Sequence, residues 1–214
     1  MTRIALIHAL ADSVAPINAA LARDWPEAQR MNLLDDSLSG DLARRGSLDA
    51  AMFQRFERLA DYAFDAGSDA ILFTCSAFGP CIEAAARKHP ARPVLKPNEA
   101  MVREAAASGA RVGLVASFAP TLASMPQEFA PGVELRTALA EGALAALQAG
   151  QSERHDELAA QAAARLAAAG CRLIALAQFS LARAAPLVAE RTGLPVLTTV
   201  DSAVRALRRR LEAR

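Results

Sequence analysis

The chain has 214 residues, with 24 Lys and Arg residues against 23 Asp and Glu residues. Its length suits one large or two small domains with a proper core, and its balanced charge gives no basic face for nucleic acid. No apolar run reaches the length of a membrane span, and Thr2 and Arg3 lead straight into a strand. We therefore expect a cytoplasmic protein without a leader peptide or a membrane partner.

Predicted strands and helices alternate through the first half of the chain. A strand over residues 3–7 ends at His8, and Asp12 or Ser13 can cap the helix that follows. Further strands are predicted at 29–34, 71–74 and 93–95. A turn is predicted at 35–37, a long helix that Ser47 caps and Gly67 ends, and a helix at 81–88.

The second half repeats this alternation. The predicted strands are 111–116, 133–136, 173–177 and 195–197, and the predicted helices are 101–107, 139–148, 152–168, 181–191 and a final helix to 211. Ser152 is the expected cap of its helix. Strands that alternate with helices at these spacings predict a parallel α/β architecture.

The chain also matches itself. Four pairs of segments align, namely 67–75 with 170–178, 93–95 with 195–197, 98–103 with 200–205, and 3–8 with 111–116. This predicts two similar halves, 1–97 and 98–199, with the C-terminal helix 200–214 packing on the first. Facing halves would bring Cys75 and Gln178 to opposite sides of one cleft. Chance similarity between Ala-rich helices and apolar strands is the alternative.

Cys75 is the leading candidate for chemistry. It follows a short apolar run that reads as a buried strand, where open parallel sheets bind ligands beyond their carboxyl ends. The structural alternative is a small buried hydrophobe, which is common for free cysteine. Three cysteines without paired-ligand spacing argue against a disulfide scaffold and a structural zinc site, and we expect Cys81 and Cys171 to be structural.

The three histidines divide into two groups. His8 stands at a strand end and is either a satisfied, half-buried residue or part of a site. His89, beside a proline in a loop, and His155, in the first turn of a helix, are expected at the surface.

Phe73-Thr-Cys-Ser-Ala-Phe-Gly79, Pro93-Val-Leu95 and the strand at 111–117 together resemble the aspartate/glutamate/hydantoin racemase superfamily. The resemblance implies two flavodoxin-like halves with an active site in the cleft between them. It implies no cofactor and no metal, because one cysteine from each half exchanges a proton with the substrate's α-carbon. Related decarboxylases and isomerases use one or two of those cysteines.

Matched by position, Cys75 corresponds to the first-half cysteine, and Gln178 stands where the second would be. The resemblance implies that the substrate-binding residues are His8, Ser76, Ala77, Ser117, Phe118, Thr121, Gln178 and Ser180. Ala77, Ser180, His8 and Gln178 depart from the glutamate racemase pattern. A neutral amide cannot trade protons near neutral pH, so Gln178 can only orient or polarise.

Cys75 needs a pKa below that of a free thiol to act as a base, and we expect a nearby helix start to lower it. The first hypothesis is a racemase-like or isomerase-like enzyme that uses Cys75 on a small carboxylate or amino-acid-like substrate. The alternatives are a one-cysteine decarboxylase, a Cys75-His8 hydrolase, and a non-catalytic binding protein. Relatives frequently pair into homodimers, and the sequence leaves the oligomeric state open.

Overall fold

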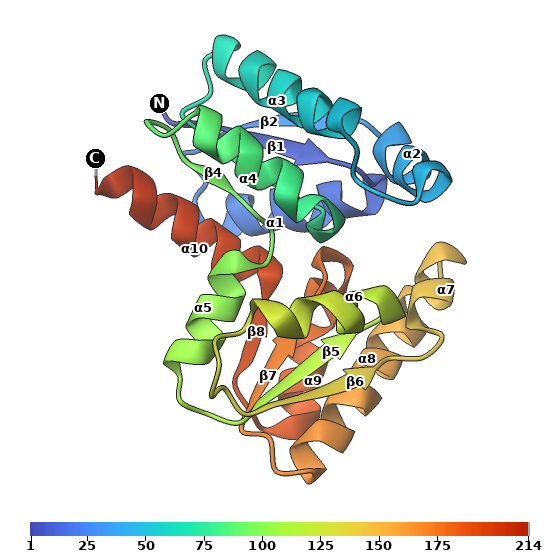
Figure 1. The fold of residues 1–214 in the computed structure, drawn as a ribbon. Helices are drawn as coiled ribbons and strands as arrows, with labels where there is room; N and C mark the ends of the chain where they lie inside the picture. The colour runs from blue at the N-terminus through green and yellow to red at the C-terminus, as the bar shows by residue number, and fades with distance from the viewer. Residues whose placement is uncertain (214) are drawn as a thin grey trace. The chain divides into compact units, whose positions relative to one another are not determined.

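The computed structural model describes residues 1–213 (Figure 1). The chain divides into two compact units. The first unit contains Met1–Pro97 and the residues from Ala203 onward, and the second contains Asn98–Ser202. Helix α10 (Thr199–Glu212) begins in the second unit and continues into the first.

The first unit is built on a parallel sheet with strand order β2-β1-β3-β4. Its strands are β1 (Arg3–His8), β2 (Gln29–Leu34), β3 (Ala70–Phe73) and β4 (Val94–Leu95). Its other elements are η1 (Ala11–Ser13), α1 (Val14–Asp24), α2 (Ser37–Arg45), α3 (Ala50–Asp65), η2 (Ser76–Phe78) and α4 (Gly79–Lys88). Helices α3 and α4 cover one face of this sheet, and α1 lies on the other (Figure 1).

The core of the first unit follows the alternation of its strands. Ala5 and Ile7 belong to the cluster formed with α3 and α4, and Ile4 and Leu6, which point to the opposite face, are also fully buried. Both faces of the sheet are therefore covered, as in parallel sheets generally. Phe56 anchors the α3 side, because its ring lies against two other phenylalanine rings. The centroid of the Phe56 ring lies 5.1 Å from that of Phe73 and 4.9 Å from that of Phe78.

The second unit has the same topology, with strand order β6-β5-β7-β8 and parallel pairing throughout. Its strands are β5 (Val112–Ala116), β6 (Leu135–Leu139), β7 (Leu173–Leu176) and β8 (Val196–Thr198). Its other elements are α5 (Glu99–Ala107), α6 (Ala119–Ser124), η3 (Met125–Glu128), α7 (Ala143–Gln148), α8 (Ser152–Ala168), η4 (Phe179–Ala184) and α9 (Ala185–Thr192). One face carries α5 and α6, and the other carries α8 and α9 (Figure 1).

Helix α8 packs tightly on the second sheet at Gly113. A Cβ atom at this position would lie 3.0 Å from Leu166 Cβ and 3.1 Å from Ile174 Cδ1. The glycine therefore lets α8 approach β5 and β7 closely.

The predicted fold is confirmed, because each half is a four-stranded parallel sheet flanked by helices. The duplication extends to the register: Ile7 of β1 pairs with Phe73 of β3, and Val115 of β5 pairs with Leu176 of β7. Cys75 lies two residues beyond Phe73, and Gln178 lies two residues beyond Leu176. The two residues thus occupy equivalent places in their sheets.

Several local predictions were wrong. Residues 37–45 form helix α2, although a turn was predicted for the segment in which it begins. Strand β6 extends to Leu139, where a helix was predicted to start. Helix α3 is capped by Asp49, whose carboxylate accepts a hydrogen bond from the Met52 N–H, and Ser47 lies outside the cap. Ser152 is the first residue of α8 and makes no capping bond.

Candidate active site

Cys75 is placed at the carboxyl end of the first sheet by strand β3, all four residues of which are buried. The Thr74 N–H still donates to the Ile7 carbonyl at 3.0 Å, and Cys75 then leaves the sheet as the extended residue before η2. Cys75 is half-buried. It helps to line a hollow that has no room for a water molecule, and the other lining residues are Ile7, His8, Ala9, Leu38, Phe56, Phe73 and Phe78.

These surroundings determine the acidity of the thiol. Burial raises the pKa of Cys75 above that of a free thiol, and a hydrogen bond from the Ala77 backbone N–H acts in the opposite direction. We expected the helix start to lower this pKa, and that expectation was wrong for the structure described. The desolvation of the apolar hollow outweighs one backbone donor. Cys75 therefore carries its proton at neutral pH.

His8 lies at the end of β1 and is fully buried. Its Nε2 donates to Asn32 Oδ1 at 3.0 Å, and its Nδ1 lies 3.0 Å from Thr74 Oγ1 and 3.2 Å from Ser13 Oγ. The Ser13 hydroxyl donates to the Leu10 carbonyl at 2.7 Å. The Thr74 hydroxyl has two acceptors within reach, the Ile7 carbonyl at 3.4 Å and Nδ1 at 3.0 Å, and the shorter contact favours donation to Nδ1. Both ring nitrogens of His8 are thus occupied.

This network keeps His8 neutral. Burial lowers the pKa of His8, and the hydrogen bond to Asn32 only partly opposes that effect. Within residues 1–213, no hydrogen bond joins His8 to Cys75. Instead, His8 fixes Thr74, the residue just before Cys75, and so stabilises the strand end that presents the thiol.

Sequence reasoning missed the three residues that hold His8, namely Ser13, Asn32 and Thr74. Ser13 was considered only as a helix cap. A faint signal existed for Asn32, a polar residue in a predicted strand beside the strand that ends at His8. A buried histidine in a parallel sheet requires such partners, because an unpaired polar group in the core is costly.

Ser76 and Ala77 follow Cys75 in the single turn of η2, and both are exposed. Helix α4 begins directly afterwards, with Pro80 in its first turn. A proline tolerates this place because the first N–H groups of a helix have no partner inside it. The thiol thus lies at the start of η2, where the Ala77 backbone N–H donates a hydrogen bond to it.

In the second unit, the carboxyl end of the sheet is held by Gln178. Its Oε1 accepts hydrogen bonds from the Ser117 backbone N–H at 2.7 Å and from the Ser117 hydroxyl at 3.1 Å. Ser117 follows β5 and Gln178 follows β7, so the pair joins the ends of two adjacent strands. Ser180 is half-buried in η4, two residues after Gln178.

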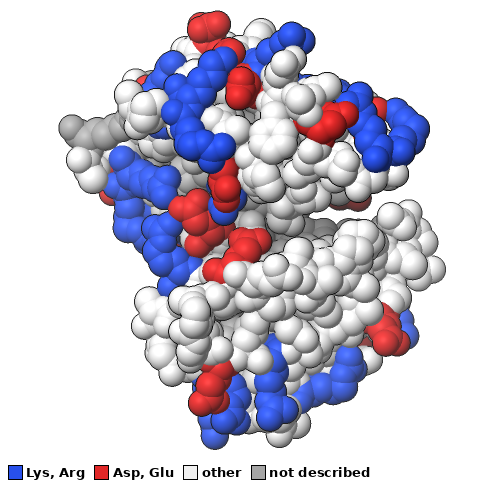
Figure 2. Space-filling model, viewed as in Figure 1, with Lys and Arg blue, Asp and Glu red and all other residues white. Residues whose placement is uncertain are grey.

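The loop that starts α6 is uncharged. Phe118 precedes the helix with 48% of its surface exposed, while Thr121, one turn later, is buried. Figure 2 shows an uncharged surface over α6.

Sequence reasoning also missed Thr199, which follows β8, the strand next to β7. Its buried hydroxyl has no hydrogen-bond partner among the described residues.

The model of the family Asp/Glu/Hydantoin racemase matches residues 17–207 of the chain. The chain belongs to this family. The match includes Cys75, Ser117, Thr121 and Gln178, whereas His8 lies before its first residue.

Solved structures of racemases share the fold of this family member. An aspartate racemase homologue from Pyrococcus horikoshii has a TM-score of 0.73 and 13% identity, and the alignment covers 99% of this chain and 100% of that one. Allantoin racemase from Klebsiella pneumoniae has a TM-score of 0.72 and 18% identity, and the alignment covers 100% of this chain and 89% of that one. A decarboxylase also shares the fold: unliganded arylmalonate decarboxylase has a TM-score of 0.60 and 15% identity, and the alignment covers 98% of this chain and 92% of that one. No curated protein sequence gives a significant match.

Of the remaining cysteines, Cys81 lies in the hydrophobic cluster against which Cys75 packs, and Cys171 lies in a cluster of the second unit. Both are fully buried, which fits the expected structural role, and burial raises the pKa of Cys81 to about 11. The prediction for the other histidines was wrong. His155 is fully buried because position 155 lies on the apolar face of α8, and the His89 side chain is only 14% exposed, with Nε2 2.9 Å from Asp61.

No group of three or more His, Cys, Asp or Glu side chains in residues 1–213 is arranged to hold a metal ion. None of the helices described is long and apolar enough to cross a membrane.

Proposed function

We propose that this chain is a cofactor-independent enzyme of the racemase and isomerase type that uses the Cys75 thiol on a small carboxylate substrate. The observation that carries the proposal is the position of the thiol. It lies at the carboxyl end of a buried strand, beside the Ala77 backbone N–H, in a chain of the Asp/Glu/hydantoin racemase family. Ligand sites of parallel α/β sheets lie at this edge.

The proposed chemistry is the delivery of a proton to one face of the substrate's α-carbon. Burial keeps Cys75 protonated, so its resting form suits a general acid. In an exchange reaction the thiolate form of Cys75 takes the α-hydrogen as a proton, and in a decarboxylation the carboxyl group leaves as CO2. In both cases the electron pair of the broken bond forms an enediolate. The thiol then donates its proton to that carbon, and solvent reprotonates the thiolate.

The proposed role of Gln178 is to hold its side of the site without exchanging protons. Its amide carries no titratable proton near neutral pH, and Oε1 is engaged by Ser117. This supports one-sided chemistry, such as isomerisation, decarboxylation or enantioselective protonation, over two-base racemisation. The proposed substrate contacts are Ser76, Ala77, Ser117, Phe118, Thr121 and Ser180.

A Cys75-His8 hydrolase is disfavoured. A histidine that activates a thiol has to accept the thiol proton directly. Both ring nitrogens of His8 are engaged by Asn32, Thr74 and Ser13. We assign His8 a positioning role, behind Thr74, in the proposed site.

The proposal is tested by isotope exchange in heavy water. The protein is incubated with single enantiomers of amino acids, hydantoins and substituted malonates, and NMR follows deuterium at the α-carbon together with the release of CO2. We expect incorporation with at least one substrate class, on one face only, and loss of incorporation in Cys75→Ala.

Cys171→Ala is the matched control, because it removes a buried thiol from the second unit. This variant should retain the exchange rate of the wild type. Exchange that persists in Cys75→Ala would overturn the role of the thiol. Ligand binding without exchange or CO2 release from any substrate would instead identify a binding protein.

A further inference from the structure

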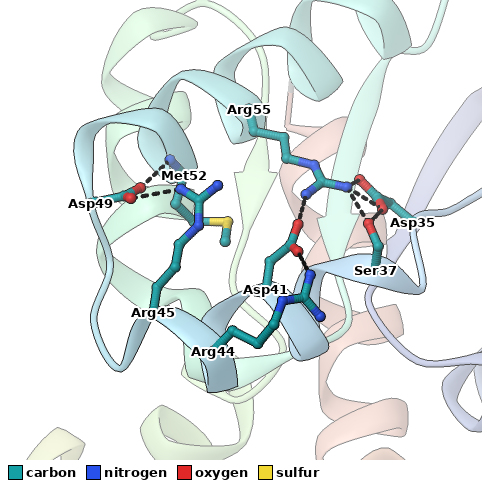
Figure 3. A network of polar contacts seen from close by, with 8 residues as sticks. All are labelled: Asp35, Ser37, Asp41, Arg44, Arg45, Asp49, Met52 and Arg55. Carbon is teal, nitrogen blue, oxygen red and sulfur yellow. Dashed lines mark hydrogen bonds and ion pairs between the residues drawn. The ribbon is translucent and has the colours of Figure 1, made fainter.

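Two arginines bond helix α2 to helix α3: Arg45 at the end of α2 bonds Asp49, the cap of α3, at 2.6 Å, and Arg55 of α3 bonds the start of α2. Arg55 of α3 donates from Nη1 to Asp41 at 2.6 Å and from Nη2 to Asp35 at 2.5 Å and to the Ser37 hydroxyl at 2.6 Å. Figure 3 shows its guanidinium between these groups. Asp35 precedes α2 and Asp41 lies within it, so Arg55 bonds both the start and the middle of this helical segment. Arg44 also reaches Asp41, but from within α2 itself.

Helix α2 has little stability of its own. It contains only nine residues, and Gly40 stands near its centre. Short helices are marginal in water, and an interior glycine weakens them further relative to alanine. The helix therefore depends on contacts with the rest of the first unit.

The inner side of α2 faces the surroundings of Cys75. Leu38 is 1% exposed and lines the same dry hollow as Cys75 and Phe56. The Ser39 hydroxyl donates to the Ala9 carbonyl at 3.4 Å, at the upper limit of hydrogen-bond length. Arg55 and Phe56 are neighbours on α3, so one turn of α3 both fixes α2 and packs beside the thiol.

From this arrangement we propose that Arg55 is a positioning residue for Cys75: by fixing α2, it holds Leu38 as a wall of the dry hollow and thereby shields the thiol from water. The proposal rests on Cys75 being the reactive thiol of the proposed function. When the contacts of Arg55 are lost, α2 opens more often, and water enters the hollow beside Cys75. Solvation then favours the thiolate, which is the nucleophilic form.

The test measures thiol reactivity and needs no substrate. Iodoacetamide is added to the full chain over a range of pH, and peptide mass spectrometry reports the alkylation rate of each cysteine. In Arg55→Met we expect Cys75 to react about tenfold faster near neutral pH, with the midpoint of its pH profile moved to lower pH. Cys81 and Cys171 serve as internal references and should keep their slow rates.

Arg44→Met is the matched control, because it removes an arginine that contacts Asp41 without joining α2 to α3. It should leave the rate at Cys75 within about twofold of the wild type. Gly40→Ala tests the opposite direction. Its new Cβ would lie 3.5 Å from Arg44 Nη1, an ordinary contact, and a firmer α2 should slow alkylation of Cys75 up to about fivefold.

Two outcomes would overturn the proposal. One is an unchanged rate and midpoint at Cys75 in Arg55→Met. The other is an equal acceleration at all three cysteines, which would indicate general loosening of the fold. If Arg55→Met fails to fold, Asp35→Asn replaces it, since this variant removes one charged partner of Arg55 with little change of shape. Because alkylation requires no turnover, the alkylation rate of Cys75 would still test the role of Arg55 if the protein were inactive towards every substrate.

Discussion

The amide oxygen of Gln178 accepts two hydrogen bonds from Ser117, one from its backbone N–H at 2.7 Å and one from its hydroxyl at 3.1 Å. The pair joins the ends of β7 and β5 in the second sheet. In the first sheet, the equivalent strand ends are joined by Thr74 and His8, whose atoms Oγ1 and Nδ1 lie 3.0 Å apart. In the first unit, Cys75, two residues beyond β3, is therefore not needed to join the strand ends. In the second unit, the equivalent residue Gln178 makes the hydrogen bonds that join them.

Gln178→Cys tests what this difference means for activity. If one-sided chemistry results from the missing second thiol, the variant should produce the opposite enantiomer of a substrate that the wild type exchanges on one face only. The variant should also lose about 1–3 kcal/mol of unfolding free energy, because sulfur replaces a strong acceptor of the Ser117 N–H. Chiral chromatography and urea unfolding measure the two effects.

Gln178→Ser is the matched control for this experiment. It also removes the amide acceptor, but it supplies no thiol. Both variants should lose stability, and only Gln178→Cys should form the opposite enantiomer. Unchanged stereochemistry in Gln178→Cys, at retained turnover, would show that the reaction is not a racemisation that lacks one thiol.

Much of the fold could be predicted because the strong signals in this sequence are local. Buried strands such as β3 and β7 are continuous apolar runs that end at polar or small residues, and their repetition shows the two halves. The position of Cys75 at a strand end follows from the same signal. Elements that depend on tertiary contacts could not be predicted. Helix α2 contains a glycine and requires Arg55 from a distant segment, so its sequence resembles a turn.

The acidity of the thiol could not be predicted from the sequence for a similar reason. A cysteine before a helix start suggests a lowered pKa, and Ala77 does supply the expected backbone donor. The opposing effect comes from the hollow, whose walls include Leu38 and Phe56, both far from Cys75 in the chain. Likewise, the partners of His8 come from three separate segments. Desolvation depends on the folded packing, which a local pattern does not contain.

Gly113→Ala tests the close packing between α8 and the second sheet. The new Cβ would lie 3.0 Å from Leu166 Cβ and 3.1 Å from Ile174 Cδ1, so the core must shift to accept it. We expect a loss of about 1–3 kcal/mol in unfolding free energy, measured by urea denaturation. Gly79→Ala is the control, since nothing lies within 4 Å of its new Cβ. Equal stability of the two variants would contradict the described packing.

Thr199→Val tests the unpartnered hydroxyl beside β8. The Thr199 side chain is 1% exposed, and Oγ1 has no hydrogen-bond partner among residues 1–213. Replacing the hydroxyl by a methyl group of similar size removes the cost of burying it, so unfolding free energy should rise by about 1 kcal/mol. Thr198→Val is the control. Its hydroxyl bonds Asp201 at 2.7 Å, and this variant should lose stability. A loss in both variants would mean that the Thr199 hydroxyl is satisfied in solution.

The buried imidazole of His8 makes the stability of the protein depend on pH. Burial lowers the pKa of His8 in the folded state, whereas in the unfolded chain it titrates near 6.5. Below about pH 6.5 the unfolded state therefore binds a proton that the folded state resists, so stability falls as the pH drops from 6.5 toward the folded pKa. One such proton contributes a slope of up to about 1.4 kcal/mol per pH unit.

His8→Gln isolates this contribution. A glutamine cannot take up the proton, so the variant should be less stable than the wild type near pH 7.5 but should lose less stability on going to about pH 5. Urea unfolding of both proteins at several pH values measures the two slopes. Ser13→Ala is the control, because it removes one neighbour of Nδ1 and keeps the histidine, and it should retain the steep slope of the wild type. If His8→Gln showed that same slope, His8 would be protonated in the folded protein, and its assignment as a neutral anchor of Thr74 would be wrong.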